Sequence, residues 1–196
     1  MLRYAPKMLI LMTLSAILTL TLWSNSWGQH QVDLPDGSKL DLSKPCPVCG
    51  MIVGGDLEGT ASYSYANGQL VVFGGAAAAV FPDGTVVGFE GARCLFIYNT
   101  VPKRFGIDVS KIVNRYVTEF GTKKMIDANG AFLVMGSKIK GPMGHELIAF
   151  STREEAEKFR AEYGGKRIVQ LGTVGAGDVE RREQPSRGKT PHGTSK

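Results

Sequence analysis

The chain has 196 residues, of which 43% are hydrophobic and 21% are charged, and this composition excludes a fibrous or wholly disordered protein. The formal net charge is +5, but two of these charges belong to the first 28 residues and two to residues 173–196. The domain between them therefore carries a net charge of only about +1. Because nucleic-acid binding needs a basic face, we expect no nucleic-acid partner.

Residues 1–28 have the pattern of a secretory signal peptide. The start is basic, residues 8–23 are apolar, and Ser26 and Gly28 place small side chains where cleavage before Gln29 requires them. An uncleaved N-terminal anchor is the alternative, because the apolar run is near the short limit for spanning a bilayer. In either case we expect a periplasmic or otherwise extracytoplasmic domain, soluble after cleavage or anchored by its leader.

Residues 29–44 form a polar lead-in, and sulfur is concentrated directly after it. The sequence Cys46-Pro47-Val48-Cys49-Gly50-Met51 places two thiols and a thioether within six residues. Thiolates and thioethers are soft donors, and Cu(I) is the first-row metal ion that prefers both. The same spacing also closes small disulfides, or forms one half of a zinc knuckle, which needs a second cysteine pair. The only other cysteine is Cys94, so a copper site is the leading interpretation.

Cys94 lies in an apolar run with helical character, residues 92–98. A buried structural cysteine is the commoner case in such a run, so we expect Cys94 to pack in the core, and a role as a metal ligand is the alternative. Because the number of cysteines is odd, at least one thiol has no partner within the chain. In an oxidising compartment Cys46 and Cys49 tend to form a disulfide, unless metal or a reductant maintains the thiols.

The sequence pattern of the domain, residues 45–172, predicts two successive units, each with the order strand, strand, helix and strand. In chain order we expect strands at 60–65, 70–73, 78–81 and 85–89, a helix at 93–101, a strand at 112–120, strands at 131–135 and 146–150 joined by a glycine-rich connection at 136–144, a helix at 153–163 and a strand at 167–171. This order favours an α+β fold of two ββαβ units with antiparallel sheets. Residues 173–196 have few apolar side chains, so we expect a disordered tail.

Three methionines beyond the cysteine motif differ in their surroundings. Met135 ends an apolar strand, which favours core packing, whereas the context of Met125 favours neither packing nor metal binding. Met143 lies in a glycine-rich stretch with no large apolar neighbour, so its thioether has little core to fill. His145 follows closely and adds a nitrogen donor. Taken alone, this context favours neither interpretation of Met143.

Three segments of the domain carry a resemblance to a known family. They are Cys46–Met51, the helix around Cys94, and residues 131–159 with their run Gly136-Ser137-Lys138-Ile139-Lys140-Gly141-Pro142-Met143-Gly144. In this order they resemble the NosL family, the accessory lipoproteins of nitrous oxide reductase. The resemblance implies an extracytoplasmic Cu(I) chaperone that works with a membrane maturation complex, and a fold similar to the non-catalytic scaffold of organomercurial lyase. The chain lacks the family's lipid-bearing cysteine.

By position, the resemblance implies Cys49, Met51 and Met143 as Cu(I) ligands, with Cys46 and His145 as weaker candidates. One thiolate and one or two thioethers hold Cu(I) at low coordination, so an incoming ligand can add before the old ones leave. We expect a monomeric metallochaperone, not an enzyme, that supplies nitrous oxide reductase or a related copper enzyme. The alternative is a thiol-disulfide oxidoreductase that uses Cys46 and Cys49, which predicts a strand leading into the motif and a lowered thiol pKa.

Overall fold

The computed structural model describes residues 30–55, 57 and 59–173. The chain divides into two compact units, Met1–Gln31 and Val32–Lys196, and the fold below is that of the second unit, although its first strand begins at Gln31. The predicted leader and nearly all of the predicted tail lie outside the described residues. In the described part, no helix is long and apolar enough to cross a membrane.

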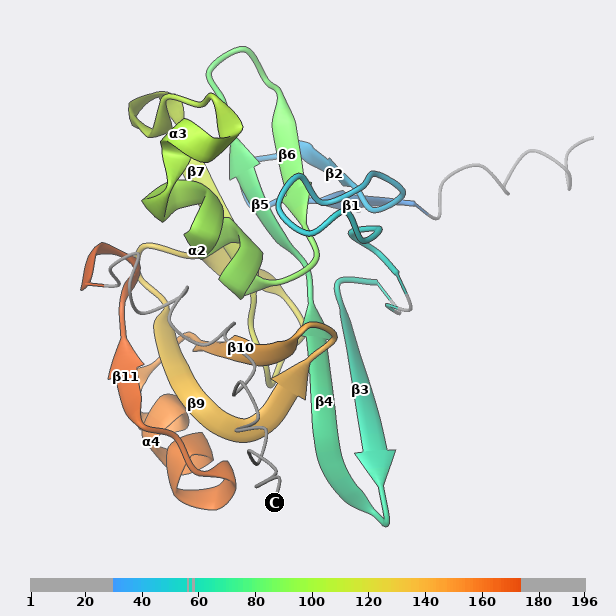
Figure 1. Ribbon diagram of the computed structural model, residues 1–196, viewed down its shortest axis with the longest axis vertical. Helices are drawn as coiled ribbons and strands as arrows, with labels where there is room; N and C mark the ends of the chain where they lie inside the picture. The colour runs from blue at the N-terminus through green and yellow to red at the C-terminus, as the bar shows by residue number, and fades with distance from the viewer. Residues whose placement is uncertain (1–29, 56, 58, 174–196) are drawn as a thin grey trace, which may run out of the picture. The chain divides into compact units, whose positions relative to one another are not determined.

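Strands outnumber helices, and they form two large sheets and one hairpin (Figure 1). The elements are β1 (Gln31–Asp33), β2 (Lys39–Asp41), β3 (Ala61–Ala66), β4 (Gln69–Gly75), β5 (Ala77–Val80), β6 (Val86–Phe89), α2 (Ala92–Thr100), α3 (Pro102–Phe105), η1 (Val109–Lys111), β7 (Asn114–Thr118), β8 (Met125–Asp127), β9 (Phe132–Gly141), β10 (Gly144–Phe150), α4 (Arg153–Tyr163), β11 (Arg167–Val169) and η2 (Leu171–Thr173). Their mixture of helices and antiparallel strands confirms the expected α+β class.

The first large sheet is built around β5 and has the order β6-β5-β7-β8. Ala77 of β5 pairs with Phe89 of β6 on one side and with Val117 of β7 on the other, antiparallel in both cases. Every residue of β5 is buried, and the first three are alanines, whose small side chains let α2 pack closely on the strand. The order β5, β6, α2, β7 is the first expected strand-strand-helix-strand unit.

The second large sheet is built around the long strand β9 and has the order β10-β9-β4-β3, with β11 also paired to β9. Leu133 of β9 lies between Ala149 of β10 and Val169 of β11, again antiparallel. Helix α4 packs on β9 and begins with a capping box, in which the Thr152 hydroxyl accepts a hydrogen bond from the Glu155 N–H. The order β9, β10, α4, β11 repeats the first unit.

The two sheets are joined directly, because Ala76 alone separates β4 from β5. The residues directly after β7 strengthen this connection: Glu119 and Ala149 form an isolated parallel bridge, and the Phe120 N–H donates to the Ala149 carbonyl at 2.9 Å. The buried apolar residues accordingly form two clusters, one around β5 and α2 and one between β9, β10 and α4. The cysteine motif and α2 both contribute to the first cluster.

The predicted connection at 136–144 is wrong for most of its length. β9 continues to Gly141, and only Pro142 and Met143 remain as the turn into β10. Ser137, Ile139 and Gly141 are buried while Lys138 between them is exposed, which is the two-residue period of a strand with one face in the core. The glycines therefore belong to a strand, and they do not mark a loop.

The polar lead-in also has more structure than its composition suggests, because β1 and β2 pair as a hairpin. Its turn is held by Asp36, whose carboxylate accepts hydrogen bonds from the Ser38 N–H and hydroxyl at 3.0 and 2.6 Å. Leu40 is almost fully buried and lies against Gly88 of β6, where a Cβ would come within 2.8 Å of its side chain. The hairpin thus packs on the first large sheet, directly before the cysteine motif.

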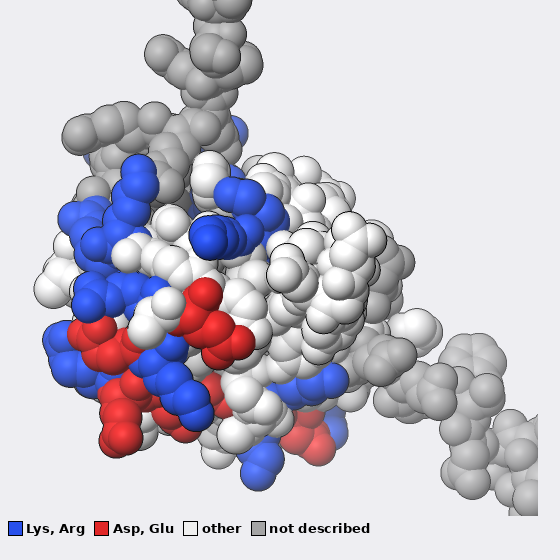
Figure 2. Space-filling model, turned by 90° about the horizontal axis from the view of Figure 1, so that it is seen from below, with Lys and Arg blue, Asp and Glu red and all other residues white. Residues whose placement is uncertain are grey.

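Charged side chains of both signs lie among one another on the face of the molecule drawn in Figure 2. The same face also has a broad area without any charged residue.

Candidate metal centre

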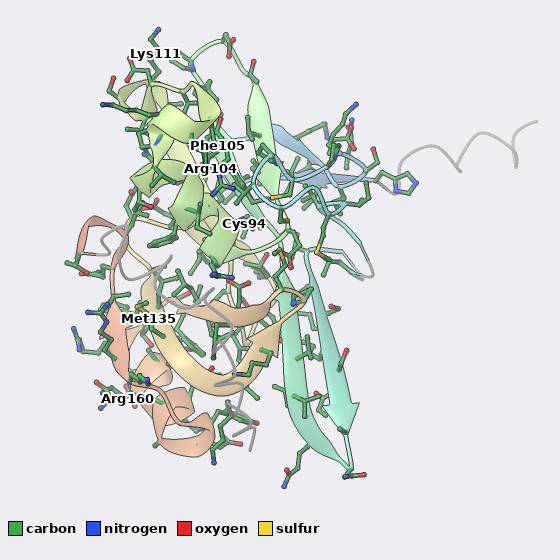
Figure 3. The ribbon with its side chains drawn as sticks, in the orientation of Figure 1. Cys94, Arg104, Phe105, Lys111, Met135 and Arg160 are labelled. Atoms are coloured by element: carbon green, nitrogen blue, oxygen red, sulfur yellow. The ribbon has the colours of Figure 1, made fainter. Side chains whose placement is uncertain are left out.

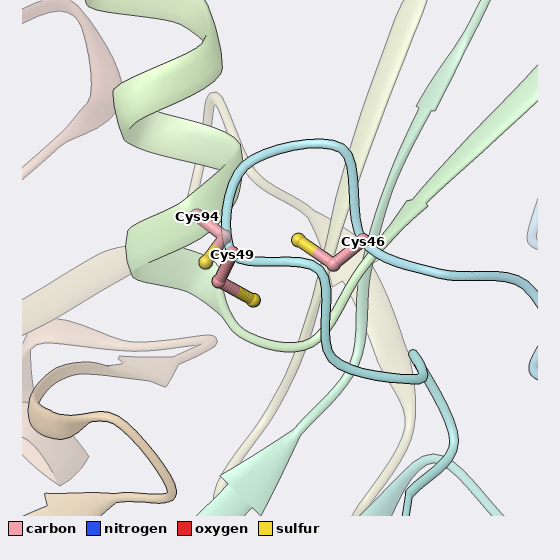
Figure 4. Close-up of side chains that lie close together, drawn as sticks. All are labelled: Cys46, Cys49 and Cys94. Carbon is pink, nitrogen blue, oxygen red and sulfur yellow. The ribbon is translucent and has the colours of Figure 1, made fainter.

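The cysteine motif forms a tight loop that is closed by an antiparallel bridge between Pro45 and Ile52. The Cys46 N–H donates to the Met51 carbonyl at 2.7 Å, and the Gly50 N–H donates to the Cys46 carbonyl at 2.8 Å. Gly50 has a φ of +79°, a left-handed conformation that a residue with a Cβ adopts only at a cost. These bonds turn the chain so that both cysteine side chains point to the same side of the loop (Figure 4).

The third cysteine comes from helix α2 and meets the other two (Figure 4). The sulfur atoms of Cys46, Cys49 and Cys94 all lie within 4.8 Å of one another, and none of the three forms a disulfide. Cys46 is 1% exposed and Cys94 is 4% exposed, while Cys49 is partly exposed. The expectation that Cys94 is buried in a helix is confirmed, but the residue also completes a cluster of three thiols.

The cluster carries negative charge before any metal binds. A hydrogen bond from the Cys94 thiol, with further bonds from backbone N–H groups, lowers the pKa of Cys46 to about 5. The same hydrogen bond, together with burial, raises the pKa of Cys94. Burial raises the pKa of Cys49 to about 11. These shifts favour the thiolate form at Cys46 and the thiol form at Cys49 and Cys94.

Met143, from the second half of the sequence, lies beside two of the three cysteines. Cys49, Cys94 and Met143 line one cavity of about 140 Å³, together with Val48, Arg93, Ile97 and Arg104. Met143 is 43% exposed and lies at the turn between β9 and β10, so its thioether is available to a bound ion. The structure thus brings together the cysteine motif and the methionine that the sequence singled out 94 residues further on.

Three candidate ligands do not line this cavity: Cys46, which belongs to the sulfur cluster, and Met51 and His145. Met51 is 40% exposed and is not among the described residues that line the cavity. His145 is exposed on β10, and its Nδ1 lies 3.2 Å from Lys140 Nζ of β9. Of the other methionines, Met135 is buried as expected, and Met125 is buried and accepts a hydrogen bond from the Thr118 hydroxyl at 3.1 Å.

Two buried carboxyl groups lie behind the cluster, and the sequence analysis predicted neither. Glu90 Oε2 lies 3.8 Å from the Cys94 sulfur, and burial together with the Cys46 thiolate raises the pKa of Glu90. Glu146 of β10 accepts hydrogen bonds from the Arg93 N–H at 2.7 Å and from the Leu147 N–H at 2.9 Å. Arg93 lies in the first turn of α2, so Glu146 fastens the Met143 hairpin to the helix that carries Cys94.

The donor set fits a soft metal ion. Metal–sulfur bonds of about 2.3 Å place the sulfurs of one trigonal or tetrahedral site roughly 4 Å apart, close to the separations of up to 4.8 Å in the cluster. Three sulfur donors with a thioether nearby match Cu(I) better than they match the harder divalent ions. A zinc knuckle of four cysteines is excluded, because the chain has only three.

Comparisons with known proteins agree with this fold. The NosL family model matches residues 38–177. Among solved structures, the copper chaperone NosL from Shewanella denitrificans is 22% identical, with a TM-score of 0.52 over 69% of this chain and 92% of that chain. The solution structure of the apo-NosL protein from Achromobacter cycloclastes is 25% identical, with a TM-score of 0.40 over 53% of this chain and 87% of that chain. No curated protein matches the chain significantly.

Proposed function

This chain belongs to the NosL family, whose model matches more than half of its length, and we propose that it binds one Cu(I) ion and passes it on by ligand exchange. The observation that carries the proposal is the cluster of Cys46, Cys49 and Cys94, which opens onto a cavity shared with Met143. A solved structure of the same fold is described as a copper chaperone, which supports the choice of metal.

In this mechanism the buried thiolate of Cys46 attracts the ion, and Cys49 and Cys94 bind it as their protons leave. Cys46 needs no deprotonation at neutral pH, because its pKa is about 5. Met143 covers the ion on the solvent side through its thioether, which is a neutral and weaker donor. The thioether is therefore the ligand that an incoming donor displaces first.

We further propose that the domain works outside the cytoplasm and that its recipient is nitrous oxide reductase, a related copper enzyme, or the membrane complex that matures one. The proposal rests on the pattern of residues 1–28 and on the resemblance of the domain to the NosL family. It assigns the protein the role of a carrier with no reaction of its own. The copper ion is then its cargo and keeps the same oxidation state throughout.

The sharpest test is an anaerobic Cu(I) titration of the reduced protein and of its three single cysteine-to-serine variants, against a competing chelator. We expect one Cu(I) per chain and tighter binding of Cu(I) than of Zn(II). Each of Cys46→Ser, Cys49→Ser and Cys94→Ser should weaken Cu(I) binding at least tenfold, because each removes one sulfur of the same cluster. Equal or tighter Zn(II) binding in direct competition would contradict the proposal.

The thiol-disulfide oxidoreductase remains the second candidate, because the lowered pKa of Cys46 is a feature of such enzymes. Accessibility argues against it. The reactive thiolate of an oxidoreductase must reach a substrate, whereas Cys46 is 1% exposed and the more exposed Cys49 has a raised pKa. Residues 42–45, which lead into the motif, form no strand. An insulin-reduction assay above background would favour the enzyme.

A further inference from the structure

Helix α2 receives its N-terminal cap from a different element of the fold. The residue at its N-cap position is Gly91, which has no side chain that could accept a hydrogen bond. The acceptor is the Glu146 carboxylate of β10, which bonds to the Arg93 N–H at 2.7 Å and to the Leu147 N–H at 2.9 Å. The positive charge of the Arg93 side chain attracts the same carboxylate. A carboxylate at this end of a helix satisfies an N–H group that lacks a partner within the helix and is stabilised by the helix dipole.

Two glycines leave the space that the Glu146 carboxyl group fills. A Cβ at Gly91 would come within 2.5 Å of Glu146 Oε2, and a Cβ at Gly141 of β9 would come within 2.6 Å of the same atom. At both positions the three nearest atoms all belong to Glu146. Gly91 has an extended backbone with a φ of −159°, which any residue adopts. The carboxyl group, and not the backbone, therefore demands a glycine at position 91.

This arrangement joins two of the proposed sulfur ligands. Cys94 lies in the first turn of α2, at the end of the helix beside β10 (Figure 3). Met143 lies three residues before Glu146, at the turn between β9 and β10. Both sulfur-bearing side chains line the cavity. Glu146 is therefore a direct contact between the hairpin that carries one sulfur and the helix that carries the other.

The hairpin, more than the helix, depends on this contact for its position. Six of the nine residues of α2 are buried, so core packing holds the helix independently of its cap. At the turn of the hairpin, by contrast, Pro142, Met143 and His145 are all exposed. Segments with few buried contacts are the first to move, so loss of the Glu146 contact should displace Met143 before it displaces Cys94.

We propose that Glu146 is a positioning residue for copper binding: it caps α2 from the β9–β10 hairpin and thereby holds Met143 beside the cysteine cluster. This inference rests on the proposed Cu(I) function and adds to it a residue that is not itself a ligand.

The test is a double-mutant cycle on Cu(I) affinity, measured by anaerobic chelator competition with the reduced full chain. Glu146→Ala removes the acceptor and should weaken Cu(I) binding about tenfold, as is typical when a group that orients a metal ligand is lost. In Met143→Leu the same change should alter the affinity less than about twofold, because no thioether remains to be positioned. A merely structural role of Glu146 would weaken binding equally in both proteins.

Glu146→Gln is the conservative variant. Because its amide oxygen still accepts hydrogen bonds, it should bind Cu(I) within about twofold of the parent. Thr152→Ala is the matched control, since it removes the N-cap of α4, whose described residues do not line the cavity. Its Cu(I) affinity should equal that of the parent, and a loss like that of Glu146→Ala would show that lowered stability alone weakens copper binding.

Gly91→Ala provides a second approach that retains the buried carboxyl group, in case Glu146→Ala does not fold. Its methyl group displaces the Glu146 carboxylate from the start of α2. Cu(I) binding should therefore weaken by about the same tenfold factor, again only in the protein that has Met143. Thermal unfolding checks that each variant is folded at the temperature of the titration.

The possible failures are distinguishable. If the parent binds no Cu(I), the proposed function falls and this inference falls with it. If the parent binds Cu(I), but the folded variants Glu146→Ala and Gly91→Ala bind it as the parent does, the positioning role is refuted while copper binding stands. The same conclusion follows if these changes weaken binding equally with and without the Met143 thioether.

Discussion

At the scale of single residues, a role of the Met143 thioether in binding would distinguish the proposed copper site from a site made only of thiols. Met143→Leu keeps the bulk of the side chain and removes the sulfur, so the fold should be unaffected. We expect the dissociation constant for Cu(I), measured by chelator competition, to rise at least tenfold. Met143 is exposed at a turn, so a loss of packing cannot account for such a change.

Met135→Leu is the internal control for this prediction. Met135 is buried in β9, where it packs in the core near α2 and β5, and no copper ligand is assigned to it. Its exchange should cost less than about 1.5 kcal/mol of unfolding free energy and leave the Cu(I) affinity unchanged. If Met143→Leu and Met135→Leu have the same affinity, the hairpin and the cysteine cluster do not share one ion.

The spacing of the sulfur-rich motif points to its cysteines, and the family resemblance points to Met143. The structure places Met143 in one cavity with Cys49, while their role as copper ligands stays a prediction. For Cys94 the sequence favours core packing over a ligand role, because an apolar helical run gives no sign of which loop will cover it. Glu146 gave no signal either, since only the folded structure shows its carboxyl group against the start of α2.

At the scale of elements, Glu146 makes the stability of the protein depend on pH. Burial, reinforced by Glu90, raises the pKa of Glu146 from 4.5 to about 7. The folded state therefore binds more protons than the unfolded state between these values, and stability falls as pH rises from about 4.5 through 7. A shift of this size corresponds to at most roughly 3 kcal/mol.

Glu146→Gln isolates this contribution, because the amide keeps an oxygen that can accept from the Arg93 and Leu147 N–H groups. Urea unfolding of the metal-free protein at pH 5 and pH 8 should show a less favourable change in stability in the parent than in Glu146→Gln, because the lowered pKa of Cys46 adds the same opposite contribution to both proteins. Glu154→Gln, at an exposed position of α4, should behave as the parent does. An identical change in all three proteins would rule out a contribution from Glu146.

Helix α4 offers a second element-scale prediction, in which stability and copper binding separate. Thr152→Ala removes the hydroxyl that accepts from the Glu155 N–H, which should cost about 1 kcal/mol of unfolding free energy. The helix packs on β9 and β10 and contributes no residue to the cavity. Thermal unfolding should register the change, whereas a Cu(I) titration of the same variant should match the parent.

The elements themselves were predictable where strong local signals bound them. The turn at Asn67-Gly68 separates β3 from β4, and the capping box at Thr152 fixes the start of α4. The glycines between Gly136 and Gly144 predict a loop, whereas the alternation of Lys138, Ile139 and Lys140 predicts a strand, and the structure has a strand as far as Gly141. Position 141 has no room for a side chain, because Glu146 lies against Gly141 and a Cβ there would come within 2.6 Å of the carboxylate.

At the scale of the whole molecule, the order of elements predicts two strand-strand-helix-strand units. It does not predict how the sheets of the two units are joined. The single residue Ala76 between β4 and β5 joins the two sheets. The sequence predicts separate strands at 70–73 and 78–81, but no local pattern shows that they belong to different sheets. The parallel bridge from Glu119 to Ala149 is likewise a long-range contact. The cavity depends on this arrangement, since α2 belongs to one unit and Met143 to the other.

The wide spacing of the sulfur donors along the chain has a consequence for the order of events during folding. Cys46, Cys94 and Met143 are separated by about fifty residues at each step, so no short segment of a nascent chain contains the complete set. Contacts between such distant residues form late, after the loops between them have closed. A half-made chain contains Cys46, Cys49 and Cys94 but lacks Met143, so the complete set of donors forms only after the turn between β9 and β10 has been synthesised and has folded beside α2.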